Sequence, residues 1–341
     1  MAVRRSQSVS LIAVLWVTLV TGSTAFSQVR PAEGALALDA ALQMALAQNP
    51  HLAAARLKKP VDAAGVDVAS QLPNPELSYE FNRDTPRHSF SVVIPIEIGG
   101  QRGRRIDLAR AVARTGDAAI AQEEFALKND VRRAYFELAA AQERVTAAAD
   151  LRGLALRARD AAQARLSLGD APRLELLQAE LELAAADNDL TTATAVVNAN
   201  RAVLNTLLGR PPATPVSAVD PLSTRGLPGA DDALTRANGA STALASIDAE
   251  IGEQSMRRAL AVAATRPEVS AGAGITSGIP DEFSAGWRAQ IGVTVPLFTR
   301  KASVAVEDHE LVRLRAERAA IVADIAGQVG EARVRALAAE Q

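Results

Sequence analysis

Cysteine is absent from this sequence of 341 residues, aromatic residues make up only 3% of it, and histidine occurs three times. Without cysteine there is no disulfide, no zinc knuckle and no lipid-modified cysteine at a mature terminus. The histidines, His51, His88 and His309, are too far apart in the sequence for the spacing of metal ligands. So few aromatic residues beside abundant alanine favour long helices packed through small side chains over a conventional globular core.

Charge and motifs also exclude several functions. The net charge of −2 is spread without a basic block, so nucleic acid is not expected as a partner. Glu123 with Glu124, and Glu175 with Glu180, resemble paired carboxylates, but solvated faces of long helices carry such pairs routinely. Residues 99–103 lack the spacing and the lysine of a phosphate loop. We therefore expect no enzyme, no cofactor, and no catalytic or metal site.

The chain has one short apolar run, Leu11–Val20, which follows two arginines and precedes small residues suited to cleavage. A membrane-spanning helix needs about 20 apolar residues, so this run predicts a cleaved signal peptide over residues 1–27. Cleavage is expected after Ala25 or Ser27. No other stretch is long and apolar enough for a membrane helix, so the exported protein could enter a membrane only with strands.

Four segments alternate apolar and polar residues, which is the pattern of a strand with one apolar face. They cover residues 76–82, 89–98, 268–276 and 287–297, and predict one β-hairpin over 76–98 and another over 268–297. Strands of this length and pattern suit an outer-membrane barrel. Four strands cannot close, and open edges are not tolerated in lipid, so three copies giving twelve strands are expected.

Helical periodicity covers most of the remaining chain. A short helix over 40–48, capped by Asp39, and a second over 51–71 are predicted before the first hairpin. A helix over 104–167 and another over 173–208 carry small or apolar residues every seventh position, which predicts an antiparallel coiled-coil hairpin over 104–208. By length, the long helix matches the helices over 51–71 and 173–208 stacked end to end.

The chain then repeats itself after a linker over 209–230. Residues 231–234 match 39–42, and residues 267–270 match 75–78, both at an offset of 192 residues. A constant offset through helices and into a strand indicates an internal repeat. The first repeat is predicted over 28–208, and the second, ending in a long helix from about Ala302, over 231–341.

Three motifs together resemble the TolC-type outer-membrane efflux family. They are Asp-x-Ala-Leu-x-x-Ala-Leu-x-x-Asn-Pro at 39–50, Pro-Asn-Pro-Glu-Leu-Ser at 73–78 and Leu-x-Leu-Gly at 166–169. The segment Pro95–Gly103 resembles the heavy-metal branch of that family, the CzcC-like and CusC-like channels. The resemblance covers nearly everything from Asp39 to Gln341.

This resemblance implies an α+β membrane protein in the outer membrane of a Gram-negative cell, with a periplasmic extension. A homotrimer would form a twelve-stranded β-barrel in outer-membrane lipid, continued by an α-barrel of antiparallel helices. Its cargo, heavy-metal cations in this branch, would pass outward unchanged. An inner-membrane pump of the resistance-nodulation-division type would deliver the cargo through a periplasmic adaptor.

Three groups of site residues are expected. The resemblance implies adaptor contact at the hairpin tip, through Arg165, Leu166, Leu168, Gly169, Asp170, Arg173 and Leu174, although turn chemistry alone also accounts for the glycine and aspartate. The joint between strand and helix is expected at Gly99, Gly100, Arg102 and Gly103, where the three glycines allow the bend. The polar strand faces are expected to line the lumen with Glu76, Glu80, Glu97, Glu268 and Arg288, as a preference for cations or as ordinary pore polarity.

Other readings of the sequence remain open. A periplasmic coiled-coil adaptor would share the helices but would need a lipoyl-like β-domain, and a scaffold protein would have no use for four one-sided strands. Pro95 matches Pro296 at an offset of 201 residues, which places a second hairpin tip near residue ~370. The sequence therefore predicts a channel truncated at its C-terminus, with a non-functional truncated paralogue as the alternative.

Overall fold

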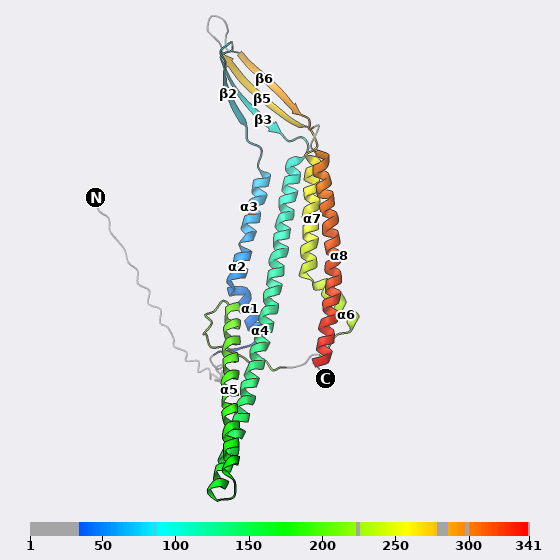
Figure 1. The fold of residues 1–341 in the computed structure, drawn as a ribbon. Helices are drawn as coiled ribbons and strands as arrows, with labels where there is room; N and C mark the ends of the chain where they lie inside the picture. The colour runs from blue at the N-terminus through cyan, green and yellow to red at the C-terminus, as the bar shows by residue number, and fades with distance from the viewer. Residues whose placement is uncertain (1–33, 85, 223–225, 278–285, 297–299, 340–341) are drawn as a thin grey trace, which may run out of the picture.

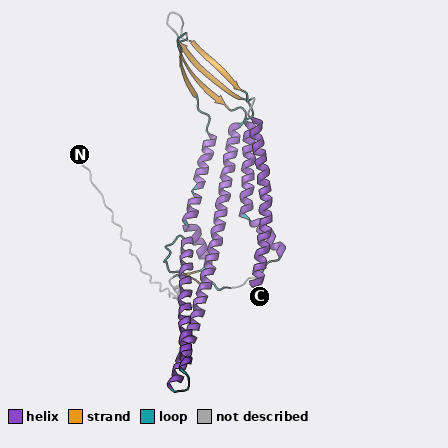
Figure 2. Cartoon of the chain, in the orientation of Figure 1, coloured by secondary structure: helices purple, strands orange, loops and turns teal. Residues whose placement is uncertain are grey.

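The computed structural model describes residues 34–84, 86–222, 226–277, 286–296 and 300–339. The predicted signal peptide over 1–27 and the last residue of the fourth predicted strand, Leu297, lie outside the described residues. Within them the chain forms a layer of long helices that carries a four-stranded sheet at one end (Figures 1 and 2).

The sheet contains the four strands that the alternating pattern predicts. They are β2 (Glu76–Phe81), β3 (His88–Ile96), β5 (Glu268–Ser277) and β6 (Gly286–Thr294). Neighbouring strands are antiparallel, and their order is β2-β3-β5-β6. The two hairpins therefore lie side by side, with β2 and β6 at the edges of the sheet.

Below the sheet, four helices follow one another in the same order as the strands to which they connect (Figure 1). They are α3 (Lys58–Ser70), α4 (Gln101–Ser167), α7 (Thr242–Ala263) and α8 (Arg300–Ala339). Contacts run from α3 to α4, from α4 to α7, and from α7 to α8. The helical layer, like the sheet, thus has two edges, which are α3 and α8.

The far half of α4 pairs with α5 (Arg173–Leu207), as the heptad pattern predicts. Several positions of both heptad seams are buried, namely Ala134, Ala141, Ala162, Leu176, Val197 and Leu204. Helix α4 begins three residues before the predicted start at Arg104. Gly100, with a φ of 75°, precedes the first helical residue, and this left-handed conformation lets the strand turn directly into the helix.

The first helices differ from the prediction in two places. The predicted helix over 51–71 is divided into α2 (Pro50–Arg56) and α3, because Pro60 cannot donate a hydrogen bond to the preceding turn. Helix α1 (Leu38–Gln48) begins after Ala37, so Asp39 lies in its first turn and is not its cap. In place of a local cap, the Leu38 N–H donates to Asp220 Oδ2 at 2.7 Å.

The second half of the chain resembles the first element by element. Helix α6 (Ala230–Ala240) has the 11 residues of α1 and begins 192 residues later, and α7 begins at the same offset from α2. Unlike α2 and α3, α7 is continuous, because Gly252 stands at the position that matches Pro60. The largest buried cluster lies where α1, α4 and α5 meet, around Tyr135, Leu138, Leu204 and Leu208.

Candidate channel-forming surfaces

The sheet exposes one continuous apolar face. The strand registers place the apolar side chains of all four strands on the same side, for example Phe90 opposite Ile275, and Ile275 opposite Trp287. These side chains are largely uncovered: Leu77 is 69% exposed, Trp287 83% and Ile291 80%. A water-soluble sheet would bury such a face, so this face must meet another apolar medium.

The opposite face of the sheet is polar and crowded by backbone. A Cβ added to Gly274 would lie 2.6 Å from the Phe90 carbonyl oxygen, and one added to Gly272 would lie 2.8 Å from the Val92 carbonyl oxygen. Neighbouring strands therefore approach so closely on this side that glycine is required at both positions. The predicted lumen residues Glu76, Glu80 and Arg288 are exposed on this face, and Glu268 is the first residue of β5.

Glu97 lies just beyond β3 and not on a polar strand face as predicted. Strand β3 ends at Ile96, and the Glu97 carboxylate accepts two hydrogen bonds from the guanidinium of Arg105. Its side chain is only 18% exposed. A carboxylate held in this bidentate pair joins the end of β3 to the first turns of α4.

Arginine side chains tie the strand–helix joint together. The Arg102 Nε donates to the Ser70 carbonyl oxygen at 2.8 Å, and Arg105 Nη2 reaches the Gln71 carbonyl oxygen at 3.2 Å. Arg266, just after α7, donates from Nη1 to the Gly99 carbonyl oxygen at 2.9 Å. The joint thus links α3, α4 and α7.

The bend between β3 and α4 involves two of the three glycines predicted to form it. Gly99 and Gly100 lie between β3 and α4, and Gly100 has the left-handed φ. Gly103, in contrast, lies inside the first turn of α4. Gly103 takes no part in the bend, because α4 begins at Gln101 and the bend is complete before it.

The middle of the helical layer contains a polar clasp that the sequence patterns did not predict. The predicted linker over 209–230 contains β4 (Ser217–Ala218), which pairs in parallel with β1 (Ala35–Leu36). The hydroxyl of Tyr135 joins them: it lies within donating distance of the Leu36 carbonyl oxygen (2.8 Å) and Asp220 Oδ2 (2.9 Å). It also accepts from the N–H groups of Val219 and Asp220, each at 3.1 Å.

One signal for this clasp was present in the sequence. The chain has only two tyrosines, and Tyr135 falls among the small residues of the α4 seam. A tyrosine buried in a helix needs a partner for its hydroxyl, and none is available locally. Burial raises the pKa of Tyr135 above its ordinary value of 10.0, because the charged form would lose its hydration.

We expect Tyr135→Phe to lower the free energy of unfolding by about 2 kcal/mol, because it leaves buried polar groups of the clasp without their partner. Tyr79→Phe is the matched control, since the Tyr79 hydroxyl bonds to His88 in an exposed position. The measurement is urea unfolding of the detergent-solubilised protein, followed by circular dichroism. Equal losses for the two variants would show that the clasp contributes nothing beyond an ordinary surface hydrogen bond.

The same clasp predicts a pH dependence. A tyrosine whose pKa is raised by folding stabilises the protein below the unfolded value and loses this contribution as pH rises above about 10. The free energy of unfolding should therefore fall more steeply above pH 10 in the parent protein than in Tyr135→Phe.

The tip between α4 and α5 is a compact turn. Gly169 has a φ of 77°, its N–H donates to the Leu166 carbonyl oxygen, and the Asp170 N–H donates to that of Arg165. This pair of hydrogen bonds is the Schellman motif, which ends helices at a left-handed glycine. The Arg165 guanidinium also bonds to Glu175 and so links the two helices across the tip.

The predicted tip residues do not all face outward. Leu168 is 79% exposed and Leu174 is 63% exposed, whereas Leu166 packs against the small buried cluster of Ala162, Leu176 and Ala179. Arg173 and Asp170 are exposed beside them. An outward-facing surface with two leucines and several charges is thus present at the end of the molecule farthest from the sheet (Figure 1).

Comparison with known protein families gives a match for residues 41–210, to the family described as outer membrane efflux protein. This chain belongs to that family. The match covers α2 to α5 with β2 and β3, so it includes the strand–helix joint, the hairpin and its tip. Members of the outer membrane efflux protein family are outer-membrane channels.

A curated relative is the cobalt-zinc-cadmium resistance protein CzcC of Cupriavidus metallidurans. It is 34% identical over 183 residues, which are 53% of this chain and 44% of CzcC. The alignment therefore spans less than half of that relative. The heavy-metal branch that the segment Pro95–Gly103 indicates is the branch in which this relative falls.

Solved structures share the fold. The CusC channel has a TM-score of 0.65 at 16% identity, over 86% of this chain and 72% of CusC. The Campylobacter jejuni CmeC channel has a TM-score of 0.67 at 14% identity, over 84% of this chain and 68% of CmeC. The open-state Neisseria gonorrhoeae MtrE channel has a TM-score of 0.61 at 17% identity, over 86% of this chain and 72% of MtrE. These similarities establish an architecture of long helices plus a sheet.

None of the helices in the described part of the chain combines the length and hydropathy of a membrane span. Across the same residues, no three side chains among histidine, cysteine, aspartate and glutamate are grouped as a metal site would need.

Proposed function

We propose that this chain is the outer-membrane channel component of a tripartite efflux system, and that it acts as a passive export duct. The observation that carries the proposal is the sheet, which has one exposed apolar face and one polar face and is attached to long helices. A sheet of this kind fits a barrel wall, with the apolar face toward lipid and the polar face toward a water-filled lumen.

The proposed assembly is a homotrimer. Four strands from each of three copies would close a twelve-stranded barrel, in which the edge strands β2 and β6 of neighbouring copies pair with each other. The helical layers of the three copies would continue this barrel into the periplasm. In this arrangement Glu76, Glu80 and Arg288 line the lumen.

The partners follow from the two ends of the molecule. The tip surface around Leu168, Gly169 and Leu174 is the proposed contact for a periplasmic adaptor, which would in turn meet an inner-membrane pump of the resistance-nodulation-division type. The exposed leucines beside charged residues support this assignment, because such surfaces are typical of protein interfaces. An adaptor or scaffold function gains no support from the sheet, for which neither would have a use.

Heavy-metal cations are the proposed cargo, supported by the name of the CzcC relative and by the segment Pro95–Gly103. Deletion of the gene is expected to lower the concentrations of cobalt, zinc and cadmium salts that the cells tolerate several-fold. The measurement is growth across a dilution series of each salt, with the deletion complemented by the intact gene. Unchanged metal tolerance with altered drug tolerance would move the cargo to another class, whereas recovery of the protein only in the soluble periplasmic fraction would contradict the channel itself.

A further inference from the structure

Helix α3 and the residues at its two ends carry exposed apolar side chains on the edge of the helical layer. Leu57, Val61, Val68 and Leu72 are each between 64% and 71% exposed. Within the helix, the spacing of Val61, Gly65 and Val68 keeps these positions on one face, while Leu57 caps α3 and Leu72 lies just beyond its end. Helix α4 does not cover this face, because α3 meets α4 through Lys59 and Asp62 on its other side.

Gly65 makes a notch in this face of α3. Within the described part of the chain, no atom lies within 4 Å of a Cβ built on Gly65. Glycine in a helix interior is unfavourable relative to alanine, and nothing in the fold of a single described copy requires it here. A neighbour that enters the notch would account for the glycine.

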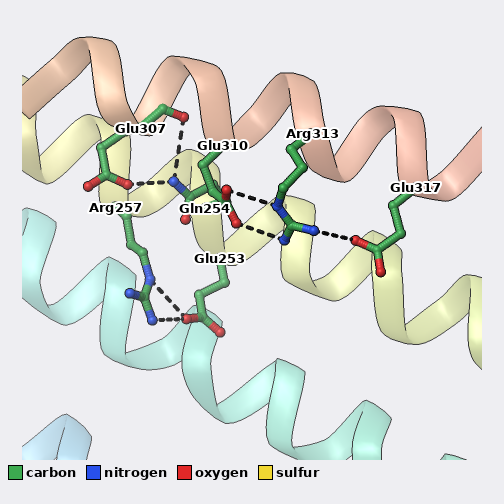
Figure 3. A network of polar contacts seen from close by, with 7 residues as sticks. All are labelled: Glu253, Gln254, Arg257, Glu307, Glu310, Arg313 and Glu317. Atoms are coloured by element: carbon green, nitrogen blue, oxygen red, sulfur yellow. Dashed lines mark hydrogen bonds and ion pairs between the residues drawn. The ribbon is translucent and has the colours of Figure 1, made fainter.

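Helix α8, at the other edge, carries a complementary seam. One side of α8 is bonded to α7: Gln254 donates to the Glu307 carboxylate, and Arg258 and Arg318 pair with Asp308 and Asp248 (Figure 3 shows the first contact). The opposite side is exposed and follows a spacing of three and four residues, through Ala302, Ala305, His309, Val312 and Ala316. This is a coiled-coil seam of small residues from which the histidine projects as the largest side chain.

The register between the two edges follows from a contact inside one copy. Helices α4 and α7 pack antiparallel: Arg266 bonds to the Gly99 carbonyl oxygen near the sheet, and Phe125 and Thr242 line one groove farther down. Helix α8 begins 199 residues after α4, and α7 begins 192 residues after α2. In the internal repeat, α8 therefore corresponds to α4, and α7 corresponds to α2 and α3. If α8 of one copy packs against α3 of the next copy in the way that α4 packs against α7, these offsets place His309 at the level of Gly65.

We propose that copies of this chain join edge to edge through α3 and α8, with His309 of one copy seated in the notch at Gly65 of its neighbour. The large side chains of α3 then pack into the alanine seam of α8, as knobs into holes. The proposal rests on the trimeric channel proposed above, and names the helical surfaces by which its copies recognise one another.

The decisive variant is Gly65→Leu in the full chain, expressed in its host and extracted from the outer membrane. Leucine has a higher helix propensity than glycine, and its Cβ would have no described atom within 4 Å in one copy, so the single copy should fold. We expect about tenfold weaker trimer formation, because a filled notch overpacks the seam. The double variant Gly65→Leu with His309→Ala should restore assembly, and Gly65→Ala should weaken assembly by less than Gly65→Leu does, because it fills less of the notch.

A cross-linking experiment tests the register directly, because the chain contains no cysteine. The pair Val61→Cys with Val312→Cys should form disulfides between copies, whereas Val61→Cys with Val306→Cys should not, since a disulfide needs Cα atoms within about 7 Å. If Gly65→Leu leaves the amount of trimer unchanged and the Val61→Cys, Val312→Cys pair forms no disulfide between copies, the α3–α8 seam is wrong. The channel proposal would remain intact. Absence of any oligomer, even in the parent protein, would overturn the trimeric channel and this seam with it.

Discussion

Ile291→Arg is expected to abolish assembly in the outer membrane. Ile291 is 80% exposed on the apolar face of β6, opposite Ala271. Arginine facing lipid near the middle of a barrel strand costs about 3 kcal/mol, and a trimer carries the substitution three times. A combined cost near ~9 kcal/mol is comparable to the whole stability of an ordinary domain.

The neighbouring residue supplies the control. Gln290→Arg introduces the same side chain one residue away, on the polar face opposite Gly272. In the proposed barrel that arginine faces water, so assembly should proceed. Both variants are compared by fractionation of membranes and by the amount of oligomer in detergent extracts. If both assemble equally well, the apolar face of the sheet does not meet lipid, and the barrel proposal fails.

Gly209→Ala is expected to give the second large effect, a loss of about 3 kcal/mol of stability. Gly209 ends α5 with a φ of 69°, and an added Cβ would lie 2.4 Å from the Gln48 carbonyl oxygen at the end of α1. A left-handed alanine costs about 1 kcal/mol. The forced separation of α1 from α5 adds roughly 2 kcal/mol, as overpacking of a core does.

Gly169→Ala separates the two contributions. Gly169 has nearly the same φ, 77°, but among the described residues nothing lies within 4 Å of an added Cβ. Only the backbone cost of about 1 kcal/mol should appear there. Urea unfolding of both variants checks this. Equal losses would mean that α1 and α5 separate freely, and that their contact does not hold the first half of the chain together.

The sequence predicts the sheet well because strand and helix signals differ there. Alternation with a period of two marks all four strands, and a one-residue shift would have turned every apolar side chain to the polar side. The heptad seams likewise predict the α4–α5 hairpin, since the buried Leu176 and Leu204 are members of the pattern. Local periodicity is therefore enough to predict the four strands and the α4–α5 hairpin.

Two of the errors come from tertiary contacts that a periodic pattern does not show. Asp39 looked like a cap, but Asp220 accepts the hydrogen bond at the start of α1 from 182 residues away. Glu97 continues the alternation of β3, yet Arg105 draws it into the joint. Neither partner could be identified from spacing alone, because both pairs depend on how the helices meet.

The clasp also determines when this protein can finish folding. The Leu36 carbonyl oxygen bonds to Tyr135, and the Leu38 N–H bonds to Asp220, which lies 182 residues later, so the start of α1 lacks this hydrogen bond until that part of the chain is present. Contacts across such a long loop form late. During that interval α1 exposes the side on which Ala41 and Ala45 are later buried, and chaperones and proteases can compete for the chain in this period.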